Sequence, residues 1–193
     1  MKLTPRIEKA IKVASHQHRG QTRPGKFRLP YVSHLFSVAA ILSEYVGDHE
    51  DVIIAGLLHD SLEDTPYSKE SLEVDFGRKV LAIVEEVTED KFTPEGRKRP
   101  WRIIKEEALV KTEKVSAEAL MIKAADHTHN LENIIDDYTE YGPVIWKNFA
   151  APLSEMLWYH RALLNILEER LDSLLVSRYR KAVEQAETEL KES

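Results

Sequence analysis

The sequence predicts an all-α fold, and three observations support this prediction. Only seven glycines and eight prolines occur in 193 residues, so long segments contain no residue that interrupts a helix. Within these segments, apolar side chains recur every three or four positions, which is the spacing of one helix face. No segment alternates apolar and polar residues as a half-buried strand does. We therefore expect a bundle of helices.

The helices of the first half are bounded by capping residues and prolines. Thr4-Pro5 combines an N-cap with a proline in the first turn, and Asp48 can cap a later helix that Thr65-Pro66 ends. A loop with three basic residues separates the first two helices. In order, the expected helices span about 5–18, 32–45, 48–64 and a short segment that begins near 68.

The second half continues the helical pattern, with a clear break at Gly142-Pro143. After the break, an apolar stripe with heptad-like spacing runs from Leu167 to Leu190. We interpret it as a helix docked on the domain, with a homodimer contact as the alternative. The expected helices span about 78–87, 100–111, 117–136, where Ser116 is the cap, and 146 almost to the end. We expect residues 1–140 to form the domain core and residues 141–193 to pack on it.

Composition and charge exclude several classes of protein. The chain has no cysteine, so disulfides, thiolate zinc sites and cysteine nucleophiles are excluded, and any metal must be bound by histidines and carboxylates. A formal net charge of −6 argues against a nucleic-acid-binding protein with a broad basic face. No apolar segment is long enough to span a membrane, and the first residues lack the apolar core of a signal peptide. We expect a cytoplasmic protein.

The most informative stretch runs from Leu57 to Asp64, where an apolar helix becomes acidic. In a continuous helix His59 and Glu63 lie one turn apart, and so do Asp60 and Asp64. Three carboxylates and an imidazole at the end of a buried helix repel one another and lose hydration, so stability does not explain them. A bound cation reconciles these charges. A hydrogen-bonded cap pair is the alternative for His59 and Asp60, but it leaves the next two acids unexplained.

Two further residues can complete a metal site. His34 lies in the first turn of an expected helix, and Asp126 directly follows a largely apolar helical run. With His59 and Asp60 they offer two nitrogen and two oxygen ligands, a set that suits Mn²⁺, Fe²⁺ or Zn²⁺ better than Mg²⁺. Taken alone, His34 could be a structural histidine, and Asp126 could pair with Lys123 or cap a helix. Four other histidines are expected to pack and hydrogen-bond around the site rather than form a second metal cluster: His16, His18, His127 and His129.

The order of these residues resembles a known family. His34, then His59 with Asp60, then Asp126 is similar to the signature of the HD superfamily of metal-dependent phosphohydrolases. The surrounding segments resemble the (p)ppGpp hydrolase domain of RelA/SpoT-type enzymes, and most of all the free-standing small alarmone hydrolases. These segments are His18 to Arg23, Pro30 to His34, Leu57 to Asp64, Phe76-Gly77, Val84 to Lys91, Arg97 to Arg99 and Lys123 to Leu131. The resemblance covers about residues 5–135 and implies an HD-domain helical bundle with a central metal site.

The resemblance also implies an activity and a cofactor. The four residues named above would be the metal ligands, and the ion is typically Mn²⁺, with another divalent transition metal as the alternative. Glu63 and Asp64 match the acidic pair that activates and orients the attacking water. The implied reaction removes the 3′-pyrophosphate of ppGpp or pppGpp and gives GDP or GTP and pyrophosphate. The expected partner is therefore a small nucleotide substrate.

Four residues are candidates for binding that nucleotide. The resemblance implies that Arg23 packs against the guanine base and that Asn130 lies close to the nucleotide. Lys91 and Arg97 belong to a basic segment that can neutralise a pyrophosphate in an otherwise acidic protein. Surface ion pairing is the alternative for Arg23, and a solvated loop is the alternative for Arg97.

Two positions depart from the family pattern. The family usually has lysine directly after the guanine-stacking arginine, where this chain has Pro24, and arginine or lysine after the last ligand, where it has His127. Lys26 or Arg28 can substitute for the first missing base. The metal chemistry stays intact, whereas the choice of nucleotide depends on these positions. Two alternatives stay open: a phosphohydrolase for another nucleotide, and a sensor that binds a nucleotide without turnover, against which the intact acidic pair argues.

Overall fold

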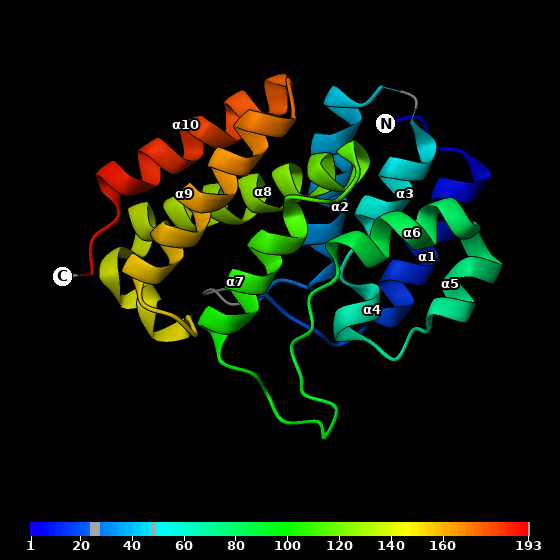
Figure 1. Cartoon of the computed structure of the whole chain (residues 1–193), viewed down its shortest axis with the longest axis horizontal. Coiled ribbons are helices and arrows are strands. Elements are labelled where there is room, and N and C mark those ends of the chain that lie inside the picture. The colour runs from blue at the N-terminus through cyan, green and yellow to red at the C-terminus, as the bar shows by residue number, and fades with distance from the viewer. Residues whose placement is uncertain (24–27, 48, 193) are drawn as a thin grey trace.

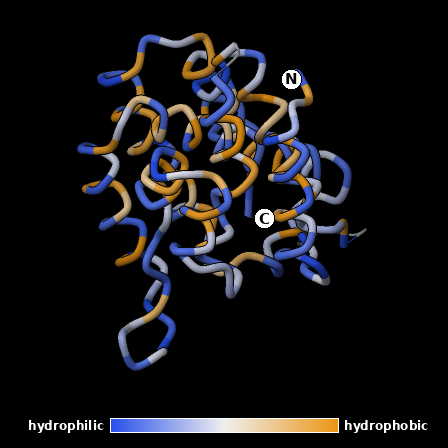
Figure 2. Tube along the Cα trace, turned by 90° about the vertical axis from the view of Figure 1, so that its right-hand side faces the viewer, coloured by the Kyte–Doolittle hydropathy of each residue, from blue (hydrophilic) through white to orange (hydrophobic). Residues whose placement is uncertain are grey.

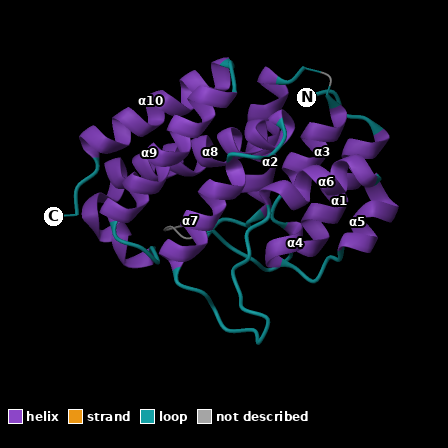
Figure 3. Ribbon diagram, viewed as in Figure 1, coloured by secondary structure: helices purple, strands orange, loops and turns teal. Residues whose placement is uncertain are grey.

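The computed structural model describes residues 1–23, 28–47 and 49–192, and helices form its regular structure apart from two isolated β-bridges (Figure 1 and Figure 3). In chain order the elements are α1 Pro5–Gln17, α2 Val32–Tyr45, α3 Glu50–Leu58, α4 Ser61–Asp64, α5 Lys69–Phe76, α6 Arg78–Val87, α7 Trp101–Thr112, α8 Ala117–Tyr141, η1 Gly142–Asn148, α9 Leu153–Arg170 and α10 Leu174–Glu189. The all-α prediction is confirmed. Three residues of the sequence analysis, Pro24, Lys26 and Asp48, lie outside the described ranges. None of the described helices is long and apolar enough to cross a bilayer.

Helix ends follow the capping residues of the sequence. Thr4 Oγ1 accepts a hydrogen bond from a backbone N–H in the first turn of α1, and Ser116 Oγ does the same at the start of α8. Gly142, with φ +67°, ends α8 in a backbone conformation that is costly for a residue with a Cβ. Helix α8 therefore continues past the predicted end near residue 136 to Tyr141.

Helix α8 lies in the middle of the bundle. Helices α2, α3 and α6 pack on one side of it and α9 and α10 on the other (Figure 1). Its buried apolar side chains belong to the core: Ala119, Leu120, Ile122, Ala124, Ala125, Leu131 and Ile135. The segment between α6 and α7 projects from the bundle and is mostly hydrophilic (Figure 2). Burial of apolar surface around α8 therefore stabilises both halves of the chain together.

Helices α2 and α3 approach closely because Gly56 has no side chain. A Cβ at this position would lie 2.3 Å from Leu42 Cδ1 in the facing helix. The approach brings His34, at the start of α2, beside His59, just after α3, with ring centroids 5.3 Å apart. The same contact that builds the core therefore sets the spacing of two candidate metal ligands.

The prediction that the third helix is continuous is wrong. Helix α3 ends at Leu58, and α4 begins only after two intervening residues. His59 Nδ1 donates a hydrogen bond at 2.8 Å to the carbonyl of Gly56, in the last turn of α3. The backbone N–H of Asp64 then bonds to the carbonyl of Asp60 at 2.9 Å, which starts a new turn. The helix is interrupted because the His59 side chain satisfies a carbonyl that the next turn would otherwise use.

From Trp146 the chain is helical almost to its end, as predicted, and the helical residues are divided among separate elements. The 3₁₀ helix η1 precedes Pro152, and α9 and α10 are separate helices that contact each other. Ser173 caps α10 by accepting a hydrogen bond from the backbone N–H of Leu175, a local signal that the apolar stripe concealed. Stripe residues from Leu175 to Leu190 are buried, and α10 packs on α8 and α9. A homodimer stays a prediction.

A buried polar pair joins the two C-terminal helices. His160 on α9 and Tyr179 on α10 are both buried, with 2.7 Å between His160 Nδ1 and the Tyr179 hydroxyl. Burial lowers the pKa of His160 from 6.5 to about 4, because the charged imidazolium would lose its hydration. The native state therefore keeps His160 neutral at pH values where the unfolded chain binds a proton.

We predict that His160→Gln reduces the acid sensitivity of the fold. In the wild type the unfolded chain gains a proton at this position below about pH 6.5, whereas the native state gains it only near pH 4. Stability due to this site is thus present above pH 6.5 and is lost as the pH falls, by about 3 kcal/mol in total. Urea unfolding of both proteins between pH 7 and 4 tests this, and equal pH slopes would contradict it.

Candidate metal centre

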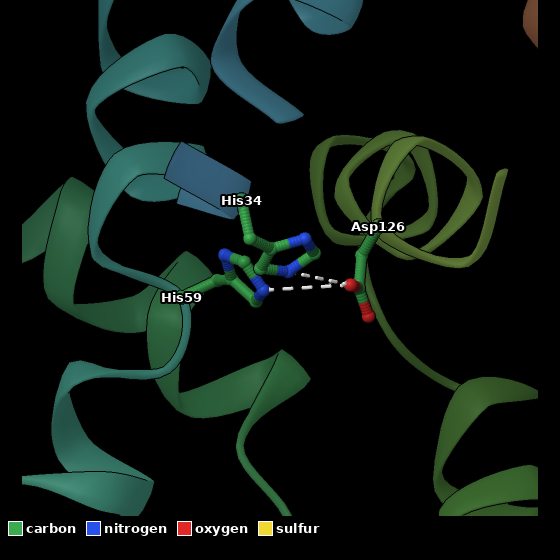
Figure 4. Close-up of side chains that lie close together, drawn as sticks. All are labelled: His34, His59 and Asp126. Atoms are coloured by element: carbon green, nitrogen blue, oxygen red, sulfur yellow. Dashed lines mark ion pairs between the residues drawn. The ribbon is translucent and has the colours of Figure 1, made fainter. Parts of the chain in front are cut away.

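Three side chains from distant parts of the sequence converge at the centre of the bundle. His34 at the start of α2, His59 after α3 and Asp126 on α8 point toward one another (Figure 4). Asp126 Oδ1 lies 3.1 Å from His34 Nε2 and 3.7 Å from His59 Nε2. Both imidazoles are buried, so bulk water has little access to their nitrogen atoms.

Asp60 contributes a second carboxylate to the same cluster. Its Oδ2 lies 3.1 Å from His59 Nε2 and 3.9 Å from His34 Nε2. The Tyr31 hydroxyl donates a hydrogen bond to this oxygen at 2.6 Å, which fixes the orientation of the carboxylate. The four residues that the sequence predicts as metal ligands are thus brought together, with two ring nitrogens facing two carboxylate oxygens.

The hydrogen bonds of His59 fit a cation-binding role. A carbonyl can only accept, so the Nδ1 that contacts Gly56 carries the proton. Nε2 is then the free acceptor of the neutral ring, yet it is buried and finds no hydrogen-bond partner among the described residues. A lone pair that faces two carboxylates is repelled unless a positive charge lies between them. The atom is oriented as a metal ligand is oriented.

The direction of the pKa shift of His59 also indicates that the cluster favours a positive charge. Burial opposes the charged form of His59, but Asp60 and Asp126 outweigh it and raise the pKa of His59 well above its usual value. His34 behaves differently, since burial lowers its pKa. Its Nδ1 lies 2.8 Å from His129 Nδ1, and this contact fixes which edge of the ring meets the carboxylates. Two imidazoles and two carboxylates form a nitrogen and oxygen set that a divalent ion satisfies.

The acidic pair predicted from the sequence lies beside this cluster. Lys91 Nζ contacts Glu63 Oε1 at 2.6 Å and Asp64 Oδ1 at 2.7 Å, so one ammonium bridges both carboxylates. The backbone N–H of Glu89 donates to Glu63 Oε2 at 2.8 Å. Burial raises the pKa of Glu63 to about 7, although Lys91 acts in the opposite direction. Glu63 is thus a carboxylate that can gain or lose a proton near neutral pH.

A cavity of about 160 Å³ opens between the histidine cluster and the acidic pair. Its charged lining consists of four carboxylates and three ammonium groups: Asp60, Glu63, Glu89, Asp126, Lys91, Lys105 and Lys123. The cavity therefore carries both signs of charge within one small space, and a divalent ion would change its net charge from negative to positive.

The predicted substrate-binding residues fall into two groups. Asn130 lines the cavity and donates to Asp126 Oδ1 at 2.7 Å, while Arg23 donates to Asn130 Oδ1 at 2.8 Å. Together with Lys91 they are close to the metal cluster. Arg97 is not, because it lies on the projecting segment with its side chain 80% exposed, and among the described residues its ion pair is with Glu95. The structure therefore does not bring Arg97 to the cavity.

Three of the four surrounding histidines pack and hydrogen-bond as expected, whereas His16 is exposed on α1 and the expectation is wrong for it. His18 stacks on Tyr31 with ring centroids 5.2 Å apart, and its Nδ1 contacts Gln21. His129 supports His34. His127, at the position where the family has a base, is buried and its Nε2 lies 3.2 Å from the Tyr159 hydroxyl. Burial holds the pKa of His127 well below its usual value, so it brings no positive charge to the cavity.

Four residues near the cavity received no role from the sequence: Tyr31, Glu89, Lys105 and Lys123. Lys105 Nζ contacts both carboxylate oxygens of Glu89, at 2.8 and 2.9 Å. The sequence contained a signal for Lys123, since it is the one charged residue in the apolar run from Ala119 to Ala125. Tyr31 lies in the segment from Pro30 to His34 that resembles the family, but no local sequence signal indicates its hydrogen bond to Asp60.

Comparison with known proteins agrees with this geometry. The model of the HD domain family matches residues 10–154. The chain is 30% identical over 174 residues to the guanosine-3′,5′-bis(diphosphate) 3′-pyrophosphohydrolase MESH1 of Mus musculus, covering 83% of this chain and 92% of that protein. It is 33% identical to MESH1 of Xenopus tropicalis, covering 88% and 93%.

A solved structure extends the agreement to three dimensions. It is described as a metazoan ortholog of SpoT that hydrolyzes ppGpp and plays a role in starvation responses. The two structures superpose with a TM-score of 0.79 at 26% identity, over 96% of this chain and 97% of the other. The resemblance to the (p)ppGpp hydrolases is confirmed, and this chain belongs to the HD domain family.

Proposed function

We propose that this chain is a metal-dependent phosphohydrolase that removes the 3′-pyrophosphate of (p)ppGpp, giving GDP or GTP and pyrophosphate. The observation that carries this proposal is the convergence of two imidazole nitrogens and two carboxylates in one cluster beside a cavity, with a separate acidic pair next to it. A cluster with a purely structural role would not require a second pair of carboxylates beside the first. The printed names of the relatives support the nucleotide.

We assign the metal to His34, His59, Asp60 and Asp126, and we propose Mn²⁺ as the ion. The set of two nitrogens and two carboxylates suits Mn²⁺, Fe²⁺ or Zn²⁺ better than an ion that prefers oxygen alone. When bound, such an ion lowers the pKa of water and neutralises charge on phosphoryl oxygens. The protein holds its ligands in place through Gly56, His129, Tyr31 and Asn130, with one hydrogen bond or ring contact to each ligand: Gly56 to His59, His129 to His34, Tyr31 to Asp60 and Asn130 to Asp126.

We assign the attacking water to Glu63 and Asp64. In the proposed step, the water oxygen bonds to the phosphorus that carries O3′, the P–O3′ bond breaks, Glu63 accepts the water proton and O3′ takes up a proton from solvent. The raised pKa of Glu63 suits a base that works near neutral pH. Asp64 orients the water, and Lys91 holds both carboxylates in position.

The nucleotide is proposed to bind across Arg23 and Asn130. Arg23 is half-buried, and its hydrogen bond to Asn130 links it to the proposed ligand Asp126. A base stacked on the Arg23 guanidinium would therefore lie no farther from the metal than the length of one nucleotide. Arg97 keeps its predicted role only for the outer phosphates, because it lies on the projecting segment. We expect its replacement to affect turnover less than replacement of Arg23.

We predict that Asp126→Asn weakens Mn²⁺ binding by at least about 100-fold, since loss of outer hydrogen-bond partners alone costs 10- to 100-fold at metal sites. The matched control is Asp136→Asn, an exposed carboxylate on the same helix. Thermal unfolding with and without Mn²⁺ measures the effect, because a bound ion raises the midpoint by mass action. Equal Mn²⁺-dependent increases in both variants would reject the ligand assignment.

We predict that Glu63→Gln lowers kcat by about 10²- to 10⁴-fold, the range of general-base catalysis, with Mn²⁺ affinity retained. The pH–rate profile of the wild type should fall on the acidic side as Glu63 gains its proton, at or below pH 7, because a cation bound nearby lowers the pKa further. The variant should lack this limb. Glu70→Gln, an exposed carboxylate on α5, is the control. Retention of the acidic limb in Glu63→Gln would assign the base elsewhere.

The substrate is tested with purified protein, Mn²⁺ and a panel of guanine and adenine nucleotides. We expect pyrophosphate release from ppGpp and pppGpp. The panel matters because His127 is neutral where the family has a base, and because Pro24 replaces a lysine. Turnover of other nucleotides with none of ppGpp would select the second phosphohydrolase hypothesis. Binding of ppGpp without cleavage of any nucleotide would select the sensor.

A further inference from the structure

The cavity beside the metal cluster contains one ammonium group that its neighbours leave unpaired. Lys123 on α8 is 5% exposed and lines this cavity. Its Nζ makes no hydrogen bond and no ion pair with any of the residues that the structure describes. A buried charge without a partner is costly, and such positions are rare unless a ligand compensates the charge.

The other two lysines of the cavity differ in this respect. Lys91 is bridged between Glu63 and Asp64 at 2.6 and 2.7 Å. Lys105 contacts both carboxylate oxygens of Glu89. These carboxylates are thereby engaged, and the alternative of an ion pair between Lys123 and Asp126 does not occur. Among the three lysines of this cavity, Lys123 is the one without a carboxylate partner in the described part of the chain. Burial lowers the pKa of Lys123, and a bound anion would favour its charged form.

The charge of the whole cavity also favours an anion beside Lys123. Four carboxylates and three ammonium groups line the cavity, which leaves one negative charge when the histidines are neutral. A divalent ion at the histidine cluster would make the balance positive by one. Lys123 lies one helical turn before Asp126 on α8, so its ammonium and the proposed ion border the same space.

We propose that Lys123 binds a phosphoryl oxygen of the substrate inside the metal cavity and retains contact with the pyrophosphate product. This inference rests on the proposed function for the identity of the anion. Lys123 supplies an ammonium group where His127 is neutral, from a position four residues earlier on the same helix. Lys123 lines this cavity although the residue is 5% exposed, so most of its side chain is covered by neighbouring residues.

The test measures binding of inorganic pyrophosphate to the full chain by calorimetry, with Mn²⁺ in excess over both protein and pyrophosphate. We expect Lys123→Met to weaken binding by about 10- to 100-fold, the loss of a hydrogen bond to a charged group. Lys114→Met removes the same charge from an exposed position beyond α7 and should leave binding unchanged. Equal affinity in the two variants, or no binding by the wild type, would overturn the proposal.

Thermal unfolding separates binding from a structural role. Methionine keeps the length of the lysine stem and removes an unpaired buried charge, so the midpoint of Lys123→Met should equal or exceed that of the wild type. A midpoint several degrees lower would show that Lys123 supports the fold, and it would overturn the proposal.

The two proposals can fail separately. Pyrophosphate binding that depends on Lys123, in a protein that hydrolyses no (p)ppGpp, would reject the proposed function and keep this anion site. Hydrolysis of ppGpp by a protein whose pyrophosphate affinity is insensitive to Lys123→Met would keep the function and reject the site.

Discussion

The structure depends on two carboxylates that face two buried imidazoles at the centre of the bundle. Asp60 and Asp126 lie within 3.1 to 3.9 Å of His34 and His59, an arrangement that is unfavourable without a positive charge between them. The interruption between α3 and α4 coincides with the hydrogen bond from the His59 ring to the Gly56 carbonyl, which orients the imidazole of His59. The close packing of α2 on α3 and the central course of α8 bring the four candidate ligands together.

The charged residues around this centre differ in whether they have a partner of opposite charge. The acidic pair is bridged by Lys91 and Glu89 is paired with Lys105, whereas Lys123 has no partner of opposite charge within the described ranges. Paired groups are held in position by their partners, whereas an unpaired group can interact with a ligand. The same space therefore contains residues suited to hold an ion, to position a water and to receive a phosphoryl anion.

The C-terminal helices account for one departure from the family pattern. His127 contacts Tyr159 on α9, and His160 on the same helix contacts Tyr179 on α10. A cationic side chain at position 127 would lose its hydration among these rings, and burial keeps His127 neutral. The residue that could have met the substrate is thus part of the packing between α8 and α9, and positive charge for an anion must come from elsewhere in the cavity.

The sequence by itself determined the all-α class, several helix starts and the set of candidate ligands, because caps, helical periodicity and ligand types are local properties. Thr4 and Ser116 show this for helix starts. Only the tertiary structure decided which charges are satisfied. Lys91 and Arg97 belong to one basic segment, yet one bridges the acidic pair and the other is exposed, since pairing depends on contacts between distant residues. The break between α3 and α4 was hidden for the same reason: the residues after Leu58 are compatible with a helix, and only the fold around the candidate metal centre favours the hydrogen bond from His59 to Gly56.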